Sequence, residues 1–178
     1  MKALATLLLM VPFAAGATDY AVDAAGSKLA FTGSAQGESF DGAFKRFTAT
    51  VSVDAASAAI AAEIDVASAD TANSERDETL ATAEFFDYAK FPTAKFHTTS
   101  CKSAGAGRYE CQAELTIRDR TQPIAFPFTF AEGGGKATLD ATVSLDRTKF
   151  DVGTGDWAGE DTVAHAVTVN VHLVLAAK

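Results

Sequence analysis

Apolar and polar residues alternate along most of this chain, and this period of two constrains the fold more than any other feature of the sequence. The clearest run lies near the C-terminus, at Val163, His165, Val167, Val169, Val171, Leu173 and Leu175. Side chains two residues apart share one face of a β-strand, so each run predicts a strand with one apolar face. Seven or eight such runs at even spacing, without α/β repeats, predict one antiparallel sandwich or closed barrel.

The composition of the apolar rows bears on what such a barrel could enclose. An eight-stranded barrel is just wide enough to be filled by side chains or to hold one small ligand. The rows mix large rings with small residues, namely Ala49, Ala62, Ala113 and Ala141. A lumen of Phe, Leu, Val and Ala could hold only an apolar ligand. The residues alone leave equally open a barrel whose rings pack against one another without a cavity.

One stretch, Asp70–Phe96, breaks the alternation. Polar residues suited to a helix N-cap come first and acidic residues follow, which predicts a short helix over about residues 74–82. An aromatic cluster comes next, formed by Phe85, Phe86, Phe91 and Phe96. Pro92 prevents the helix from continuing. We expect these rings to be buried in the mouth or the interior of the barrel.

The first 17 residues have the composition of a secretory signal peptide. Lys2 precedes the apolar run Ala3–Ala14, which is shorter than the roughly 20 residues of a spanning helix, and Ala15–Ala17 is an A-x-A cleavage signal. We therefore expect residues 1–17 to be removed and residues 18–178 to form one periplasmic domain, without stable membrane insertion. The formal net charge of −8 argues against nucleic acid and anionic membrane surfaces as partners.

The chain has two cysteines, Cys101 and Cys111, which flank the turn-rich segment Ser103–Gly107. In a hairpin centred on Ala106 they would lie directly opposite each other, within bridging distance. In an oxidising periplasm, we expect a disulfide between them. A redox pair or a metal site lacks support, because the spacing is not C-x-x-C and no histidine cluster joins it.

Several motifs, in order along the chain, resemble those of the YceI-like family of periplasmic lipid-binding proteins. They are the G-x-F-x-x-F segment Gly42–Phe47, Arg-Asp-x-x-Leu at Arg76–Leu80, Phe-Phe-Asp at Phe85–Asp87, Phe-Pro-x-x-x-Phe at Phe91–Phe96, Leu115–Pro123 and Asp146–Phe150. The resemblance covers essentially the whole chain after residue 17. It implies an extended lipocalin-like barrel that binds a polyisoprenoid, such as the tail of an isoprenoid quinone, in its lumen.

The chain departs from the family pattern at a few positions. The family often has Gly where this chain has Ala113, Asp119 and Asp151, and acidic residues often precede the last strand, where this chain has His165 and Ala166. Asp accepts left-handed backbone better than most residues, so the fold is expected to tolerate these changes. They bear instead on the identity of the ligand and on its head-group contacts.

We therefore predict an all-β fold, an antiparallel eight-stranded lipocalin-like barrel with one short helix between strands. It is predicted to bind an amphiphilic isoprenoid lipid, a polyisoprenoid or an isoprenoid quinone, for storage, transport or shielding. The predicted ligand-binding residues are Phe31, Phe44, Phe47, Phe85, Phe86, Phe96, Leu115, Ile117, Phe126, Phe128, Val143, Val169, Val171 and Arg76. Arg76 would meet a polar head group near the mouth. The alternative is that Arg76 and Asp77 bond nearby backbone and fix the helix to the rim.

No catalytic set is recognisable, so we expect no reaction and no cofactor. His165 and His172 would face opposite sides of one strand and could not share a metal ion, and His165 is expected to be a buried neutral imidazole with a backbone partner.

Two other functions stay open, namely a filled-core interaction or structural module without a ligand, and an enzyme that acts on a lipid or quinone. The sequence also leaves open whether the barrel forms a homodimer.

Overall fold

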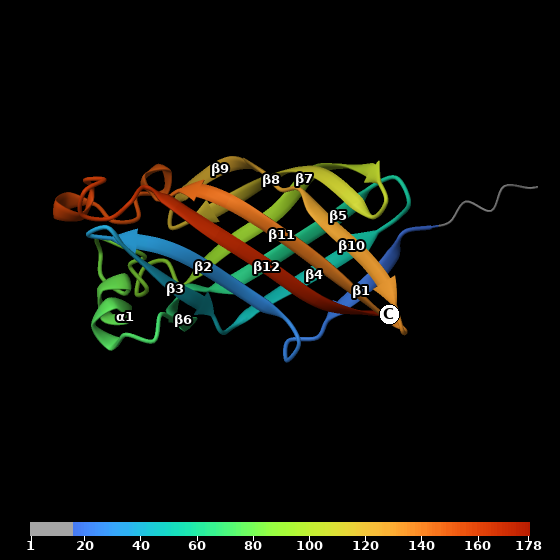
Figure 1. The fold of residues 1–178 in the computed structure, drawn as a ribbon, viewed down its shortest axis with the longest axis horizontal. Helices are drawn as coiled ribbons and strands as arrows, with labels where there is room; N and C mark the ends of the chain where they lie inside the picture. Colours follow the sequence, from blue (N-terminus) through green and yellow to red (C-terminus); the bar gives the residue numbers. More distant parts are fainter. Residues whose placement is uncertain (1–15) are drawn as a thin grey trace, which may run out of the picture.

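Most of the chain forms β-strands in the computed structural model, which describes residues 16–178 (Figure 1). The elements in order are β1 (Thr18–Val22), β2 (Lys28–Ala35), β3 (Glu38–Phe44), β4 (Phe47–Val53), β5 (Ala58–Asp65), η1 (Val66–Ser68), β6 (Ala69–Asp70), α1 (Ser74–Leu80), β7 (Thr93–Gly105), β8 (Arg108–Ile117), β9 (Arg120–Ala125), β10 (Phe128–Gly133), β11 (Lys136–Asp146), η2 (Arg147–Phe150), η3 (Gly155–Trp157) and β12 (Ala166–Ala177). The predicted signal peptide lies almost wholly outside the described residues.

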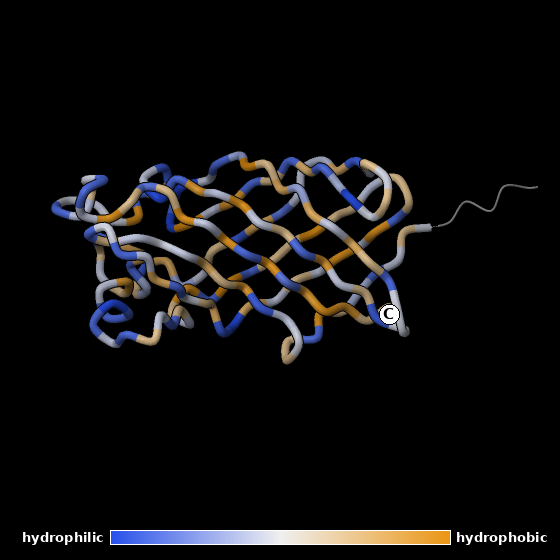
Figure 2. Tube along the Cα trace, viewed as in Figure 1, coloured by the Kyte–Doolittle hydropathy of each residue, from blue (hydrophilic) through white to orange (hydrophobic). Residues whose placement is uncertain are grey.

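The strands close into the predicted eight-stranded antiparallel barrel. Several of its long strands are interrupted, so that β1 with β2, β3 with β4, β5 with β6, and β9 with β10 each act as one wall strand. The two segments β1 and β2 both pair with β12, and the β1–β12 pairing closes the barrel. Hydrophobic and hydrophilic residues alternate along the strands (Figure 2), as expected for a wall with one inner and one outer face.

The alternation of Ile124, Phe126, Phe128 and Phe130 indicates one apolar row, within which Pro127 predicts an edge or bulged position. The row breaks into β9, which pairs with β8, and β10, which pairs with both β8 and β11. Pro127 lies at the break. Proline has no backbone N–H and cannot donate a hydrogen bond to a β-ladder, so the pairing is interrupted there. Residues 119–123, Asp-Arg-Thr-Gln-Pro, predict a turn from their composition, but the turn is shorter in the structure. β9 already begins at Arg120, after a turn in which Arg118 takes a φ of 57°.

The last strand begins later in the sequence than the alternation indicates. It begins at Ala166, so Val163 and His165 precede it. Val163 keeps an isolated bridge to Ala35 at the end of β2. Its side chain is still buried, which explains why it continues the apolar period.

The only described α-helix, α1, matches the predicted segment and ends two residues earlier, at Leu80. Asn73 is its N-cap and accepts a hydrogen bond from the Arg76 N–H, while Asp77 lies in the first turn. The Asp77 carboxylate accepts bonds from the N–H and the hydroxyl of Thr71, at 2.9 and 2.7 Å. These bonds fix the start of the helix to the end of β6. No helix within residues 16–178 has the length and apolar character to cross a bilayer.

Aromatic rings fill the end of the barrel that holds the C-terminus. Tyr109 stacks on Phe128 with ring centroids 4.9 Å apart, and Tyr20 meets Phe130 edge-on at 5.4 Å. The Tyr20 hydroxyl donates to Glu132, and burial together with this carboxylate raises the pKa of Tyr20 to about 12. This half of the lumen is therefore a packed core.

The predicted disulfide is confirmed. Cys101 and Cys111 pair directly across β7 and β8 and are bonded to each other. The bond closes a short loop over the hairpin tip, and Cys111 itself is buried in the core.

We expect the double substitution Cys101→Ala/Cys111→Ala to lower the free energy of unfolding by about 2–3 kcal/mol, because a closed loop of this length restricts the unfolded chain. Chemical denaturation of the variant and of the wild type, each with and without reductant, measures the difference. The reduced wild type should approach the variant. An oxidised wild type no more stable than the variant would contradict this account.

An apolar cavity at the helix end of the barrel

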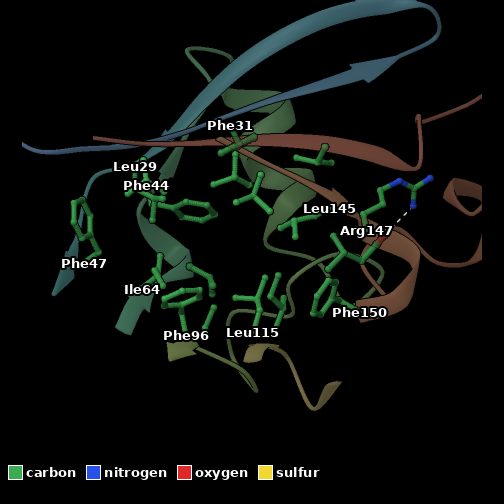
Figure 3. A pocket seen from close by; sticks show the side chains of 18 of the residues that line it. Leu29, Phe31, Phe44, Phe47, Ile64, Phe96, Leu115, Leu145, Arg147 and Phe150 are labelled. Atoms are coloured by element: carbon green, nitrogen blue, oxygen red, sulfur yellow. Dashed lines mark hydrogen bonds between the residues drawn. The ribbon is translucent and has the colours of Figure 1, made fainter. Parts of the chain in front are cut away.

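The half of the barrel nearer α1 holds a cavity of about 220 Å³ (Figure 3). Its wall is formed by inward-facing residues of most strands, and two chain excursions add the rest: the α1 segment after β6 and the segment between β11 and β12. Among the described residues that line it, only Ser34 and Arg147 carry polar side chains. The cavity therefore offers an apolar ligand almost nothing but hydrocarbon and aromatic surface.

Most of the side chains predicted from alternation come together in this cavity. Those that line it are Phe31, Phe44, Phe47, Phe85, Phe86, Phe96, Leu115, Ile117, Phe126, Val143, Val169 and Val171. Phe128 does not line it, because its ring packs on Tyr109 in the filled half. Arg76 lies outside the lining, with its guanidinium 4.2 Å from the centroid of the Phe40 ring. Participation of any of these residues in ligand binding stays a prediction.

Further lining residues fall into two groups. One lies on strands whose alternation already indicated an inner face, and its members include Leu29, Ile60, Ile64, Leu139, Leu145, Val167 and Leu173. The other lies on the two excursions, where Leu80, Phe150, Val152 and Ala164 have no strand period to mark an inner face, while Val163 continues the period of the last strand. Isolated apolar residues such as Val152 carry no sequence signal that assigns them to the lumen.

Two aromatic rings of the cavity lie over glycines on the partner strand. Phe31 faces Gly42 and Phe40 faces Gly33 in the β2–β3 ladder. A Cβ on Gly42 would overlap the Phe31 ring, and one on Gly33 would lie 2.8 Å from Phe40 Cζ. The missing side chains let both rings lie flat against the wall, which leaves the lumen open.

We expect Gly42→Ala to reduce lipid affinity, because the new methyl group displaces the Phe31 ring toward the lumen. Overpacking of this kind costs about 1–3 kcal/mol, so a loss of affinity of about tenfold with a modest loss of stability is expected. Calorimetric titration with a lipid ligand measures the affinity. Ala43→Val, at the neighbouring position on the other face of the strand, is the control, and equal effects of the two changes would contradict the prediction.

Arg147 fixes the end of the cavity that the excursions cover. The residue is only 5% exposed. Its N–H groups donate at 2.6–3.0 Å to the backbone carbonyls of Val152, Gly153, Trp157, Val163 and Ala164. Burial lowers the pKa of Arg147. Because every donor of the guanidinium is engaged by backbone, Arg147 organises the cap and offers no free donor to a ligand.

The cap joins the two excursions into one unit. Glu84 O accepts bonds from the N–H groups of Gly153 and Thr154, at 2.7 and 2.9 Å. The Phe85 ring, which lines the cavity, meets the Trp157 ring edge-on at 5.5 Å. Asp151 provides the turn that starts this loop, with a φ of 54°, the left-handed conformation that its aspartate was expected to tolerate.

The histidines do not form a chemical site. His165 is half-buried, and its ring contacts Glu160 Oε2 at 2.7 Å and Ala158 O at 2.8 Å. The expected backbone partner is present, but the expectation of a buried imidazole was wrong, because His165 lies on the loop before β12 and not on the strand. His172 pairs with Asp140 on the outer face. No group of three or more potential metal ligands comes together within the part of the chain that the structure describes.

Comparisons with known proteins agree with this architecture. A UPF0312 protein of Vibrio cholerae is 31% identical over 157 residues, which are 82% of this chain and 83% of the relative. One of Pseudomonas savastanoi is 35% identical over 162 residues, 84% of each chain. The crystal structure of Burkholderia cenocepacia BcnA superposes with a TM-score of 0.82 at 33% identity, covering 86% of this chain and 98% of that one.

A polyisoprenoid-binding domain from Saccharophagus degradans, implicated in plant cell wall breakdown, has the same fold. Its TM-score is 0.71 at 15% identity, over 89% of this chain and 98% of that one. The family profile of the YceI-like domain matches residues 20–175, nearly the whole of the described chain. The protein therefore belongs to the YceI-like family.

Proposed function

We propose that this protein binds an amphiphilic isoprenoid lipid, a polyisoprenoid or an isoprenoid quinone, and stores, carries or shields it in the periplasm. The observation that carries the proposal is the apolar cavity at the α1 end, whose described lining has two polar side chains, one of them with all its donors engaged. A lipid tail is the ligand class whose transfer from water to such a surface is favourable.

The free energy gained by that transfer grows with the length of the tail. Each buried CH₂ group contributes about 0.8 kcal/mol, so one five-carbon isoprene unit contributes roughly 3–4 kcal/mol before the costs of association. Two units contribute about 6–8 kcal/mol, against association costs of about 4–15 kcal/mol, so a tail of several units is needed for tight binding. The polyisoprenoid-binding domain of Saccharophagus degradans, which shares the fold, gives the proposal a precedent for the chemistry of the tail.

The filled-core alternative accounts for only half of the lumen. The end at Tyr20 and Tyr109 is packed with rings, while the end at α1 is hollow although its lining is equally apolar. A purely structural barrel gains stability from filling such a space, since empty volume forfeits packing contacts. The hollow half therefore favours a binding role over a filled-core module.

Trp157 provides an intrinsic reporter for the test, because it is the only tryptophan of the chain and its ring contacts the cavity residue Phe85. Saturable quenching of its fluorescence by a quinone carrying an isoprenoid tail, and reversal by an excess of a non-quenching polyisoprenol, are expected. The same quinone ring without a tail should quench only weakly. Equal quenching by both quinones, without competition by the polyisoprenol, would overturn the proposal.

A further inference from the structure

In the barrel wall, β9 and the second half of β11 are neighbours without a backbone ladder between them. The β10–β11 ladder runs from Gly133 opposite Lys136 to Phe128 opposite Ala141 and stops there. Beyond Pro127 the chain continues as β9, which pairs with β8 and not with β11. Phe128 lies opposite Ala141, so if the antiparallel ladder continued in the same register, Ile124 would lie opposite Leu145. We call the line between β9 and residues 142–146 of β11 the β9–β11 seam; both strands can be followed in Figure 1.

The cavity reaches this seam from the inside. Ile124 on β9 and Leu145 on β11 are both half-buried and both line the cavity. They occupy the two sides of the seam at the position where the missing pair would stand. Unpaired facing strand edges forgo ladder hydrogen bonds, which folded proteins rarely do without a compensating use.

Beyond the end of the seam, side chains of Arg118, Arg120 and Gln122 bond the segment that follows β11, and Arg118 donates there to the backbone carbonyl of Asp151. Gln122 Nε2 donates to the backbone carbonyl of Lys149 at 3.1 Å, and Arg120 Nε donates to Asp151 Oδ2 at 2.7 Å. Both acceptors belong to the short segment that follows β11. Exposed contacts of this kind contribute little stability and exchange readily with water.

We propose that the β9–β11 seam is the portal through which the lipid tail enters and leaves the cavity, an inference that rests on the proposed lipid-binding function. Opening it breaks no backbone ladder, and the polar contacts beside it come from three side chains, Arg118, Arg120 and Gln122. Opening the capped end would instead require rupture of the Arg147 bonds to five carbonyls. The opposite end is closed by the packed rings of Tyr20 and Tyr109.

The test measures the rates of lipid exchange in an Arg120→Ala/Gln122→Ala variant by stopped-flow quenching of Trp157. The probe is a quinone with two isoprene units. Both the association and the dissociation rate are expected to rise together, by about fivefold, because the variant loses two of the three side-chain contacts beside the seam and such exposed contacts stabilise the closed state only weakly. The dissociation constant should change by less than about twofold, since neither side chain lines the cavity.

Two control variants make the result specific. Lys136→Ala removes a comparably exposed ion pair, Lys136 with Asp23 at 3.2 Å, away from the seam and should leave the rates unchanged. Arg76→Ala frees the Phe40 ring beside α1. Unchanged rates in the seam variant, or faster exchange in Arg76→Ala alone, would overturn the portal while leaving the binding function intact. The absence of saturable quenching in the wild type would instead refute the binding function itself.

Discussion

Ala62→Phe is expected to lower lipid affinity by at least about tenfold while the barrel stays folded. Ala62 lies on β5 between Ala49 of β4 and Phe96 of β7, and all three residues line the cavity. A phenyl ring at this position can only point into the lumen, where it occupies the space that a lipid tail would take. Calorimetric or fluorescence titration with an isoprenoid quinone measures the loss.

The matched control is Ala61→Phe, one residue earlier on the same strand. Ala61 is exposed on the outer face, so the same ring points into solvent and leaves the lumen unchanged. The two variants differ only in the face that carries the ring. Wild-type affinity in Ala61→Phe together with a large loss in Ala62→Phe is the expected result, and equal affinities in the two would place the ligand elsewhere.

Arg147→Met is expected to lower the free energy of unfolding by about 3–5 kcal/mol, which corresponds to a fall of roughly 10 °C in melting temperature for a chain of this size. The change keeps an apolar stem of similar length, but it leaves five backbone carbonyls without their donor. The cap loses the group that holds its loop closed. Thermal denaturation followed by circular dichroism measures the shift.

Two further variants separate the contribution of the Arg147 hydrogen bonds to stability from the contribution of its positive charge. Arg147→Lys keeps the positive charge but supplies three donors in place of five, so it should fall between the wild type and Arg147→Met. Arg108→Met removes an exposed arginine on β8 and should change the melting temperature little. A melting temperature for Arg147→Met within a degree or two of the wild type would show that the cap does not depend on this residue.

The strands could be predicted from the sequence because their alternation is nearly unbroken. One residue in two must face the core of a closed sheet, and the apolar rows at Phe47–Val53 and Leu139–Leu145 report that face directly. The short helix could be predicted from its N-cap and first-turn acids. The disulfide followed from the symmetry of Cys101 and Cys111 about a turn.

The division of the lumen into a filled and a hollow half could not be predicted, since both halves are lined by the same residue types. Phe128 and Phe126 belong to the same apolar row, yet Phe126 lines the cavity and Phe128 packs on Tyr109. The outcome depends on which rings meet across the barrel, and strand period carries no such information. A local pairing of Arg147 near Trp157 could be predicted from the sequence, but its full set of acceptors could not, because they are backbone carbonyls of a loop without any side-chain motif.

The most direct test of the binding role uses the protein after incubation with a total lipid extract from a bacterial envelope. The protein is purified again, and native mass spectrometry with extraction of the bound material reports what it retained. We predict a discrete added mass that corresponds to an isoprenoid lipid, present in the wild type and in Ala61→Phe and absent from Ala62→Phe. An unchanged protein mass, or uptake of phospholipids in the proportions of the extract, would contradict the account.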